Sequence, residues 1–126
     1  MDNDRKQLIL VVDDDIQLLD VLHKALEERG FAVITASTGK RALEMLENTT
    51  PDLFIIDLKM EPMNGFDFYQ RIRKIHTFAK TPAFFFTGVN EALAERFSKT
   101  LGVESYISKP VEMDVLEAHI RKALSH

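Results

Sequence analysis

Four aspartates follow apolar runs of this chain, three of them side by side. Asp13, Asp14 and Asp15 come directly after the run LILVV, and Asp57 ends the run DLFIID. Neighbouring carboxylates repel and raise one another's pKa unless a cation lies among them. Because carboxylate oxygens with no sulfur and no nearby histidine favour Mg²⁺ or a similar hard ion, the pattern predicts a magnesium site.

Two further polar residues stand at the ends of later apolar runs. Thr87 closes the run AFFFT, and Lys109 follows the run SYIS. A lysine ammonium can neutralise phosphate oxygens, and a threonine hydroxyl can donate a hydrogen bond to the same group. Together with carboxylates and Mg²⁺, these groups are typical of phosphoryl transfer. In such a site Asp57 would be the nucleophile and would form an aspartyl phosphate.

The elements that position these residues alternate along the chain between short apolar runs and amphipathic stretches. Such alternation, with strands that are almost uniformly apolar, favours an α/β fold with a doubly wound five-stranded parallel sheet and helices on both faces. Ligands of such sheets bind outside the carboxyl ends of the strands, which is where the polar residues occur. The five expected strands are Leu8 to Val12, Ala32 to Ala36, Asp52 to Asp57, Ala83 to Thr87 and Ser105 to Ser108.

Each expected helix has an apolar face and residues typical of helix ends. Gly30 is expected to close the first helix, Thr38 to cap the second, and Gly102 to end the fourth. The inward-facing residues, in chain order, are Leu18, Leu22, Ala25 and Leu26; Leu43 and Leu46; Phe68, Ile72 and Ile75; Leu93, Phe97 and Leu101; and Leu116, Ile120, Ala123 and Leu124.

Length and composition limit the classes of protein to consider. The 126 residues suffice for one compact domain, 1–126, with 45% hydrophobic and 29% charged residues. A net charge of -4 argues against direct binding of nucleic acid. The absence of cysteine fits a reducing compartment, and the polar N-terminus is not a signal peptide. With no apolar run near it long enough to span a membrane, a cytoplasmic domain is expected.

The chain resembles the receiver domains of two-component response regulators, the family of the chemotaxis response regulator. The resemblance rests on VVDDD, IIDLKM followed by NG, FFFTG and SYISKP, in this order and at similar spacing, and extends from Leu8 to about Leu124. It implies a flavodoxin-like receiver fold. It also implies a switch that accepts a phosphoryl group on Asp57 from a phosphohistidine of a sensor histidine kinase or phosphotransfer protein, and that catalyses only its own phosphorylation and dephosphorylation.

The resemblance also assigns roles to single residues. Asp13 and Asp14 fall at the positions of the acidic pair that binds Mg²⁺ together with Asp57, and the backbone carbonyl of Lys59 would be a further ligand. The phosphoacceptor, the switch hydroxyl, the switch aromatic residue and the phosphate-binding lysine would be Asp57, Thr87, Tyr106 and Lys109. The peptide bond before Pro110 would be cis. A downstream protein target or output domain would dock on the fourth helix, fifth strand and fifth helix.

Two features depart from the family pattern. Many receiver domains have proline directly after the methionine of the metal-side loop, whereas Met60 is followed here by Glu61 and then by Pro62. Residue 59 is a lysine whose side chain is expected near the site, where its ammonium would repel Mg²⁺ or pair with Asp14 or Asp57. Both features are expected to change metal affinity and phosphoryl lifetime.

Other interpretations remain open at this stage. A magnesium-dependent phosphohydrolase of the haloacid dehalogenase type also uses an aspartate nucleophile, but VVDDDIQ lacks the threonine of its DxDxT-like loop. A pseudo-receiver that only binds partners usually lacks an acid or the lysine, and both are present here. Asp15 is also expected as a helix N-cap, because acidic residues favour the first turn. Tyr106 is either a switch residue or part of the packing.

Overall fold

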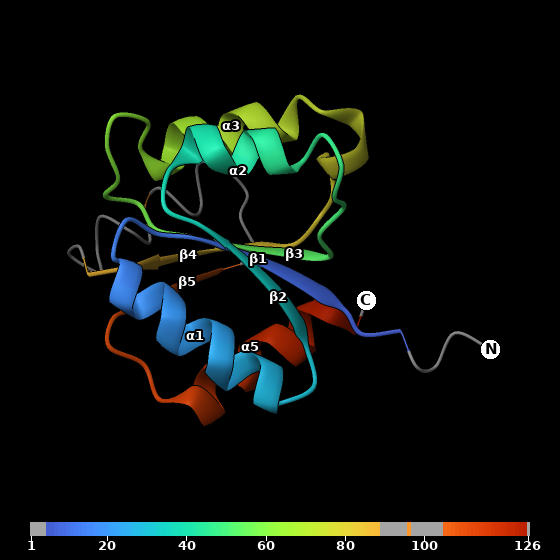
Figure 1. Cartoon of the computed structure of the whole chain (residues 1–126), viewed down its shortest axis with the longest axis vertical. Helices are drawn as coiled ribbons and strands as arrows, with labels where there is room; N and C mark the ends of the chain where they lie inside the picture. Colours follow the sequence, from blue (N-terminus) through green and yellow to red (C-terminus); the bar gives the residue numbers. More distant parts are fainter. Residues whose placement is uncertain (1–4, 89–95, 97–104, 126) are drawn as a thin grey trace.

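Five parallel strands form one sheet at the centre of the molecule (Figure 1). The computed structural model describes residues 5–88, 96 and 105–125. The order of the strands is β2-β1-β3-β4-β5, and every neighbouring pair is parallel. The expected doubly wound sheet is therefore confirmed. The strands are β1 (Leu8–Val12), β2 (Ala32–Ala36), β3 (Leu53–Ile56), β4 (Ala83–Thr87) and β5 (Ser105–Ser108).

Helices lie on both faces of this sheet. Figure 1 shows α1 (Ile16–Glu28) and α5 (Met113–Leu124) on one face, and α2 (Gly39–Met45) and α3 (Gly65–Arg73) on the other. A short 3₁₀ helix, η1 (His76–Phe78), follows α3. The helix expected between Asn90 and Gly102 lies outside the described residues.

The strands of the sheet separate two apolar layers because successive side chains point to opposite faces. Ile9 and Val11 of β1 belong to the layer beneath α1 and α5, whereas Leu10 and Val12 belong to the layer beneath α2 and α3. All four side chains are fully buried. Water is therefore excluded from both faces of the sheet at β1, which explains why the sequence of β1 is an unbroken apolar run.

Local signals set the ends of the helices largely as expected. The Asp15 side chain accepts a hydrogen bond from the backbone N–H of Leu18 at the start of α1, and Thr38 accepts one from Arg41 at the start of α2. Gly30, just past α1, has a φ of 99°, a conformation that glycine adopts without steric cost.

Some expectations for the apolar faces were wrong. Ile75 was expected on the buried face of α3, but the helix ends at Arg73 and the Ile75 side chain is 37% exposed. In α1 the fully buried side chains include Leu19, which the pattern did not place inward, while Leu18 is only half-buried. In α2 it is Ala42 that is fully buried. The remaining inward positions, Leu43 and Leu46, are half-buried and pack against the α2–α3 layer.

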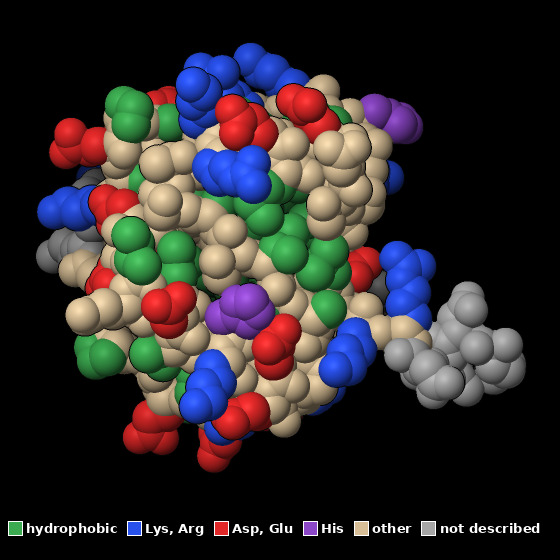
Figure 2. Space-filling model, in the orientation of Figure 1, with side chains coloured by type: hydrophobic (Ala, Val, Ile, Leu, Met, Phe, Trp, Pro, Cys, Tyr) green, Lys and Arg blue, Asp and Glu red, His purple; other side chains and the backbone are tan. Residues whose placement is uncertain are grey.

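Charged side chains of both signs are spread over the face of the molecule seen in Figure 2, with Lys and Arg gathered along the edge above α2 and α3. This mixture is typical of a surface that faces water. Among the described helices, none combines the length and the apolar composition that crossing a membrane requires.

Candidate functional site

Backbone hydrogen bonds carry the polar residues to one edge of the sheet. Beyond the last residues of β1 and β3, the Asp13 N–H donates to the carbonyl of Ala36 over 3.1 Å, and the Asp57 N–H donates to the carbonyl of Val12 over 2.9 Å. The Lys109 N–H donates to the carbonyl of Thr87 over 2.9 Å. The ladder thus extends one residue past the apolar strands, which brings side chains distant in sequence to the same end.

Three carboxylates from two neighbouring strands meet at this edge. One oxygen each of Asp13, Asp14 and Asp57 lies within 4.8 Å of the others. Asp13 is 1% exposed and Asp57 is 4% exposed, whereas Asp14 is open to solvent. The acidic residues that the sequence pattern singled out are therefore brought together, at spacing that one small cation can bridge.

Lys109 lies against the two buried carboxylates. Its Nζ is 2.7 Å from Oδ2 of Asp13 and 3.6 Å from Oδ1 of Asp57. The same Nζ lies 5.4 Å from the centre of the Phe86 ring, within the range of a cation–π contact. In the sequence, Phe86 is part of the apolar run AFFFT, and no signal there indicated its contact with the lysine.

Burial and charge shift the acid–base behaviour of this cluster. Desolvation, together with the nearby charge of Asp13, raises the pKa of Asp57 from 3.8 to about 6, although Lys109 acts in the opposite direction. Burial by itself lowers the pKa of Lys109, but its close contacts with the carboxylates of Asp13 and Asp57 outweigh burial, so that this pKa is raised. The lysine therefore stays a cation, and it only partly offsets the repulsion between the carboxylates.

The donor set fits a magnesium ion. Asp13 Oδ1 accepts a hydrogen bond from the Asp15 N–H over 2.9 Å. Asp13 Oδ2 is buried, and among the described residues its short contact to Lys109 lacks a well-aligned hydrogen-bond geometry. A buried carboxylate oxygen in this position has a lone pair that a cation can use. The neighbouring oxygens of Asp14 and Asp57 supply further hard ligands.

The loop after β3 places Lys59 at the rim. Its backbone N–H points to Asp57 Oδ1 over 3.3 Å, and its side chain is exposed. The expected pairing of its ammonium with Asp14 or Asp57 was wrong, since within the described part of the chain the cation that pairs with the cluster is Lys109. The peptide bond between Lys109 and Pro110 is cis, as expected, and the bond between Glu61 and Pro62 is also cis.

Thr87 and Tyr106 lie on the neighbouring strands β4 and β5. Thr87 is 1% exposed at the last position of β4. Tyr106, paired in register with Phe85, is half-buried and packs against the α2–α3 layer. Its packing role is therefore visible, and its role as a switch stays a prediction.

Residues 9–121 match the family described as the response regulator receiver domain. The chain belongs to this family. Receiver domains serve phosphorylation-based signalling and are generally not classed as enzymes.

Solved receiver domains have the same fold as this chain. The chemotaxis protein CheY4 of Vibrio cholerae superposes with a TM-score of 0.89 at 26% identity, over 94% of this chain and 99% of that one. A CheY-like receiver domain from Methanospirillum hungatei gives 0.87 at 30% identity, over 95% and 94%. TrrA of Thermotoga maritima, solved in complex with Mg²⁺-BeF, gives 0.82 at 27% identity, over 94% and 99%.

Among curated proteins, this receiver domain is 36% identical over 116 residues to the transcriptional regulatory protein CpxR of Escherichia coli. It is 32% identical over 124 residues to the probable transcriptional regulator ycf27 of Guillardia theta. These matches cover 92% and 98% of this chain but 48% of each relative. The chain therefore spans about half the length of the curated relatives it matches.

Proposed function

We propose that this receiver domain accepts a phosphoryl group on Asp57 from a phosphohistidine of a sensor histidine kinase or phosphotransfer protein, with the help of Mg²⁺. The observation that carries the proposal is the meeting of Asp13, Asp14 and Asp57 within 4.8 Å, with Lys109 against two of them, Asp13 and Asp57. We assign the metal to these three carboxylates and to the backbone carbonyl of Lys59. That TrrA was solved with Mg²⁺-BeF supports a magnesium site of this kind.

The roles of the residues follow from their charge. An oxygen of Asp57 attacks the phosphorus of the donor, the P–N bond breaks, and its electron pair leaves with the imidazole nitrogen. The product is an acyl phosphate on Asp57, which water later hydrolyses. Lys109 neutralises charge on the phosphoryl oxygens, and Thr87 donates a hydrogen bond to one of them. A magnesium ion held by Asp13, Asp14 and Asp57 would supply further positive charge there.

The signal is expected to leave through the edge of the molecule formed by β5, α5 and the helix expected between Asn90 and Gly102. New charge on Asp57 attracts Thr87 and Lys109 at the ends of β4 and β5. Tyr106 lies on β5, the strand that leads along the chain to α5. A downstream protein target or output domain would dock there, and we assign this domain no direct contact with nucleic acid.

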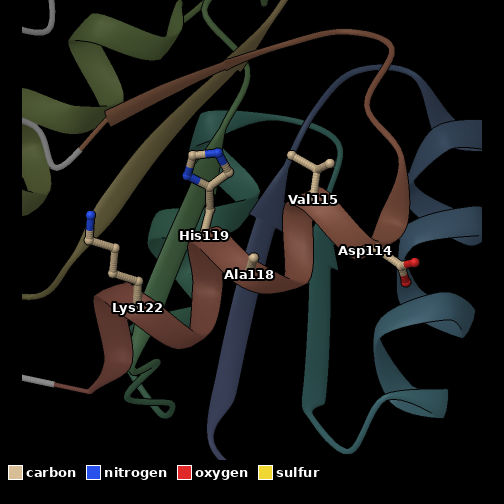
Figure 3. A pocket seen from close by; sticks show the side chains of 5 residues that line it. All are labelled: Asp114, Val115, Ala118, His119 and Lys122. Atoms are coloured by element: carbon tan, nitrogen blue, oxygen red, sulfur yellow. The ribbon is translucent and has the colours of Figure 1, made fainter.

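The exposed side of α5 has a surface suited to such docking. A pocket lies along this helix, and Figure 3 shows the ring of His119 and the side chain of Val115 among the residues that line it. Val115 is 46% exposed, so its apolar side chain is open to a partner. The His119 ring stands edge-on to Phe84 of β4, 6.1 Å between centres. The helix surface is thereby connected to the strand that ends in Thr87.

Intact-mass measurement tests the proposal. Incubation with Mg²⁺ and a small phosphodonor such as acetyl phosphate should add one phosphoryl group to the protein, and Asp57→Asn should abolish the addition. Asp20→Asn, which removes an exposed carboxylate of α1, is the matched control and should label normally. Labelling of the Asp57→Asn variant at the parent level would overturn the assignment.

The same samples separate the two alternatives. Rapid turnover of a free phosphomonoester would favour the phosphohydrolase. An unlabelled parent protein that still binds Mg²⁺ would favour the pseudo-receiver. The presence of Lys109 beside Asp13 and Asp57, in a cluster that also contains Asp14, makes phosphotransfer the better supported function.

A further inference from the structure

Gly65, the first residue of α3, touches the backbone that carries Asp57. A Cβ built on Gly65 would overlap the carbonyl oxygen of Asp57, and would lie 2.8 Å from the Cα of Leu58 and 3.0 Å from the carbonyl carbon of Asp57. All three are backbone atoms, so no side-chain rotation can relieve the overlap. Any residue other than glycine must therefore move either α3 or the segment that holds Asp57.

Both sides of this contact are firmly held. The Asp57 N–H donates to Val12 of β1, and the Gly65 N–H donates to the carbonyl of Leu58 over 3.0 Å. On the helix side, Phe68 and Ile72 are fully buried in the α2–α3 layer. Because strand and helix are both anchored, an added side chain would displace the short stretch between them, which contains Leu58 and the carbonyl of Lys59.

The glycine is not required by the backbone conformation of its own position. Among the described glycines, Gly30 is the one with a positive φ. At an unhindered helix position, alanine is more favourable than glycine because it loses less backbone freedom on folding. Helix propensity thus favours alanine at position 65, and the close approach to Asp57 is the feature that opposes it.

We propose that Gly65 is a positioning residue: its missing Cβ sets how closely α3 approaches the end of β3, and thereby the orientation of the Asp57 carboxylate and the Lys59 carbonyl. This inference rests on the proposed function, in which those two groups bind Mg²⁺ and Asp57 accepts the phosphoryl group. The glycine acts through the backbone it contacts and touches no reacting atom itself.

Gly39 and Gly88 provide matched controls for alanine substitution. Gly39 is also the first residue of a helix, α2, and is also buried, but a Cβ there would meet the flexible side chain of Met63. Gly88 follows Thr87 at the same rim, and a Cβ there meets no described atom within 4 Å. Gly39→Ala therefore controls for the change in helix propensity that Gly65→Ala also makes. Gly88→Ala controls for the effect of replacing any glycine close to the site.

The experiment compares the parent with Gly65→Ala, Gly39→Ala and Gly88→Ala. Calorimetric titration gives the Kd for Mg²⁺, intact mass gives the rate of phosphorylation by acetyl phosphate at saturating Mg²⁺, and urea unfolding gives stability. Gly65→Ala should weaken Mg²⁺ binding and slow phosphorylation, each by roughly tenfold or more, because small misplacements of reacting groups are costly. Both controls should stay within about twofold of the parent, as expected where no backbone is displaced.

The outcomes are separable. If the parent labels and Gly65→Ala labels and binds Mg²⁺ as well as the controls do, the positioning role is wrong and the proposed function stands. If the parent takes no phosphoryl group, the proposed function fails, and the Mg²⁺ titrations still test Gly65. A poorly folded variant is measured in trimethylamine N-oxide, which favours folded states. Failure to fold there would make Gly65 a folding residue and overturn the proposal.

Discussion

Asp57 combines burial with an unfavourable electrostatic environment. It is 4% exposed, lies beside the buried carboxylate of Asp13, and has a pKa raised to about 6 by desolvation and by that neighbour. In the metal-free protein above pH 6, the ionised carboxylate therefore opposes folding. A cation bound among these carboxylates, as we propose, would offset this cost.

Removing the charge of Asp57 should stabilise the metal-free protein. In EDTA at pH 7.5, we expect Asp57→Asn to raise the free energy of unfolding by about 1–2 kcal/mol, because a pKa increase from 3.8 to about 6 corresponds to roughly 3 kcal/mol before relaxation. The folded pKa is the higher one, so the folded parent binds more protons and regains stability as the pH falls through 6. Urea unfolding should show that the variant exceeds the parent in free energy of unfolding by less at pH 4.5 than at pH 7.5. An equal difference at both pH values would contradict this cause.

Lys59 contributes a positive charge at the rim without pairing to the acidic cluster. Since its ammonium is exposed, repulsion from bound Mg²⁺ is largely screened by water and salt. We expect Lys59→Ala to bind Mg²⁺ roughly twofold more tightly, a change of about 0.4 kcal/mol, and to leave Asp57 phosphorylatable. Calorimetry at low and high salt measures the change, which should disappear at high salt. Weaker binding by the variant would show that this side chain supports the site.

Helix α1 illustrates how an element is fixed at both ends. Asp15 caps its start, and Arg29 at its end contacts α5, with Nη1 2.8 Å from Asp114 Oδ1 and 2.6 Å from Glu117 Oε1. Arg121 of α5 donates to the carbonyl of Arg29 and stacks over the Phe31 ring. These contacts join the two helices that cover the same face of the sheet.

The capping role of Asp15 can be separated from its charge. Asp15→Ala should lower the free energy of unfolding by about 1 kcal/mol, because the N–H of Leu18 loses its side-chain acceptor. Asp15→Asn keeps an acceptor oxygen and should retain most of the stability. Thermal unfolding in EDTA compares the three proteins. Equal losses in both variants would mean that charge, and not the cap, stabilises the helix.

The site depends on the whole folded molecule because its carboxylates come from separate strands. Asp13 and Asp14 follow β1 and Asp57 follows β3, and these segments are brought together only by the folded sheet. An ion bound there has no comparable site in the unfolded chain, so binding and folding are linked.

Mg²⁺ should therefore raise the stability of the entire domain. We expect a gain of about 2.7 kcal/mol when the ion is present at a hundred times its Kd. Urea unfolding with MgCl₂, against NaCl of equal ionic strength, measures the gain. Asp13→Asn should remove most of it, since we propose that the buried carboxylate of this residue supplies a ligand oxygen. A gain of equal size in that variant would place the ion elsewhere.

The sequence by itself determined the strands and the edge at which chemistry occurs. Runs such as LILVV can be recognised because both faces of a parallel sheet exclude water, and the residue after each run must lie at the carboxyl edge. Local chemistry likewise predicted the caps at Asp15 and Thr38 and the turn at Gly30. The family resemblance, rather than spacing, supplied the individual roles of the site residues.

Only the tertiary structure decided which groups approach one another. It showed that Lys109, and not Lys59, pairs with the carboxylates, and that the Phe86 ring lies beside that lysine. It also showed that Gly65 contacts the backbone of Asp57. These contacts join residues on different strands, helices and loops. They depend on strand register and on the distance between helix and sheet, which no local pattern along the chain encodes.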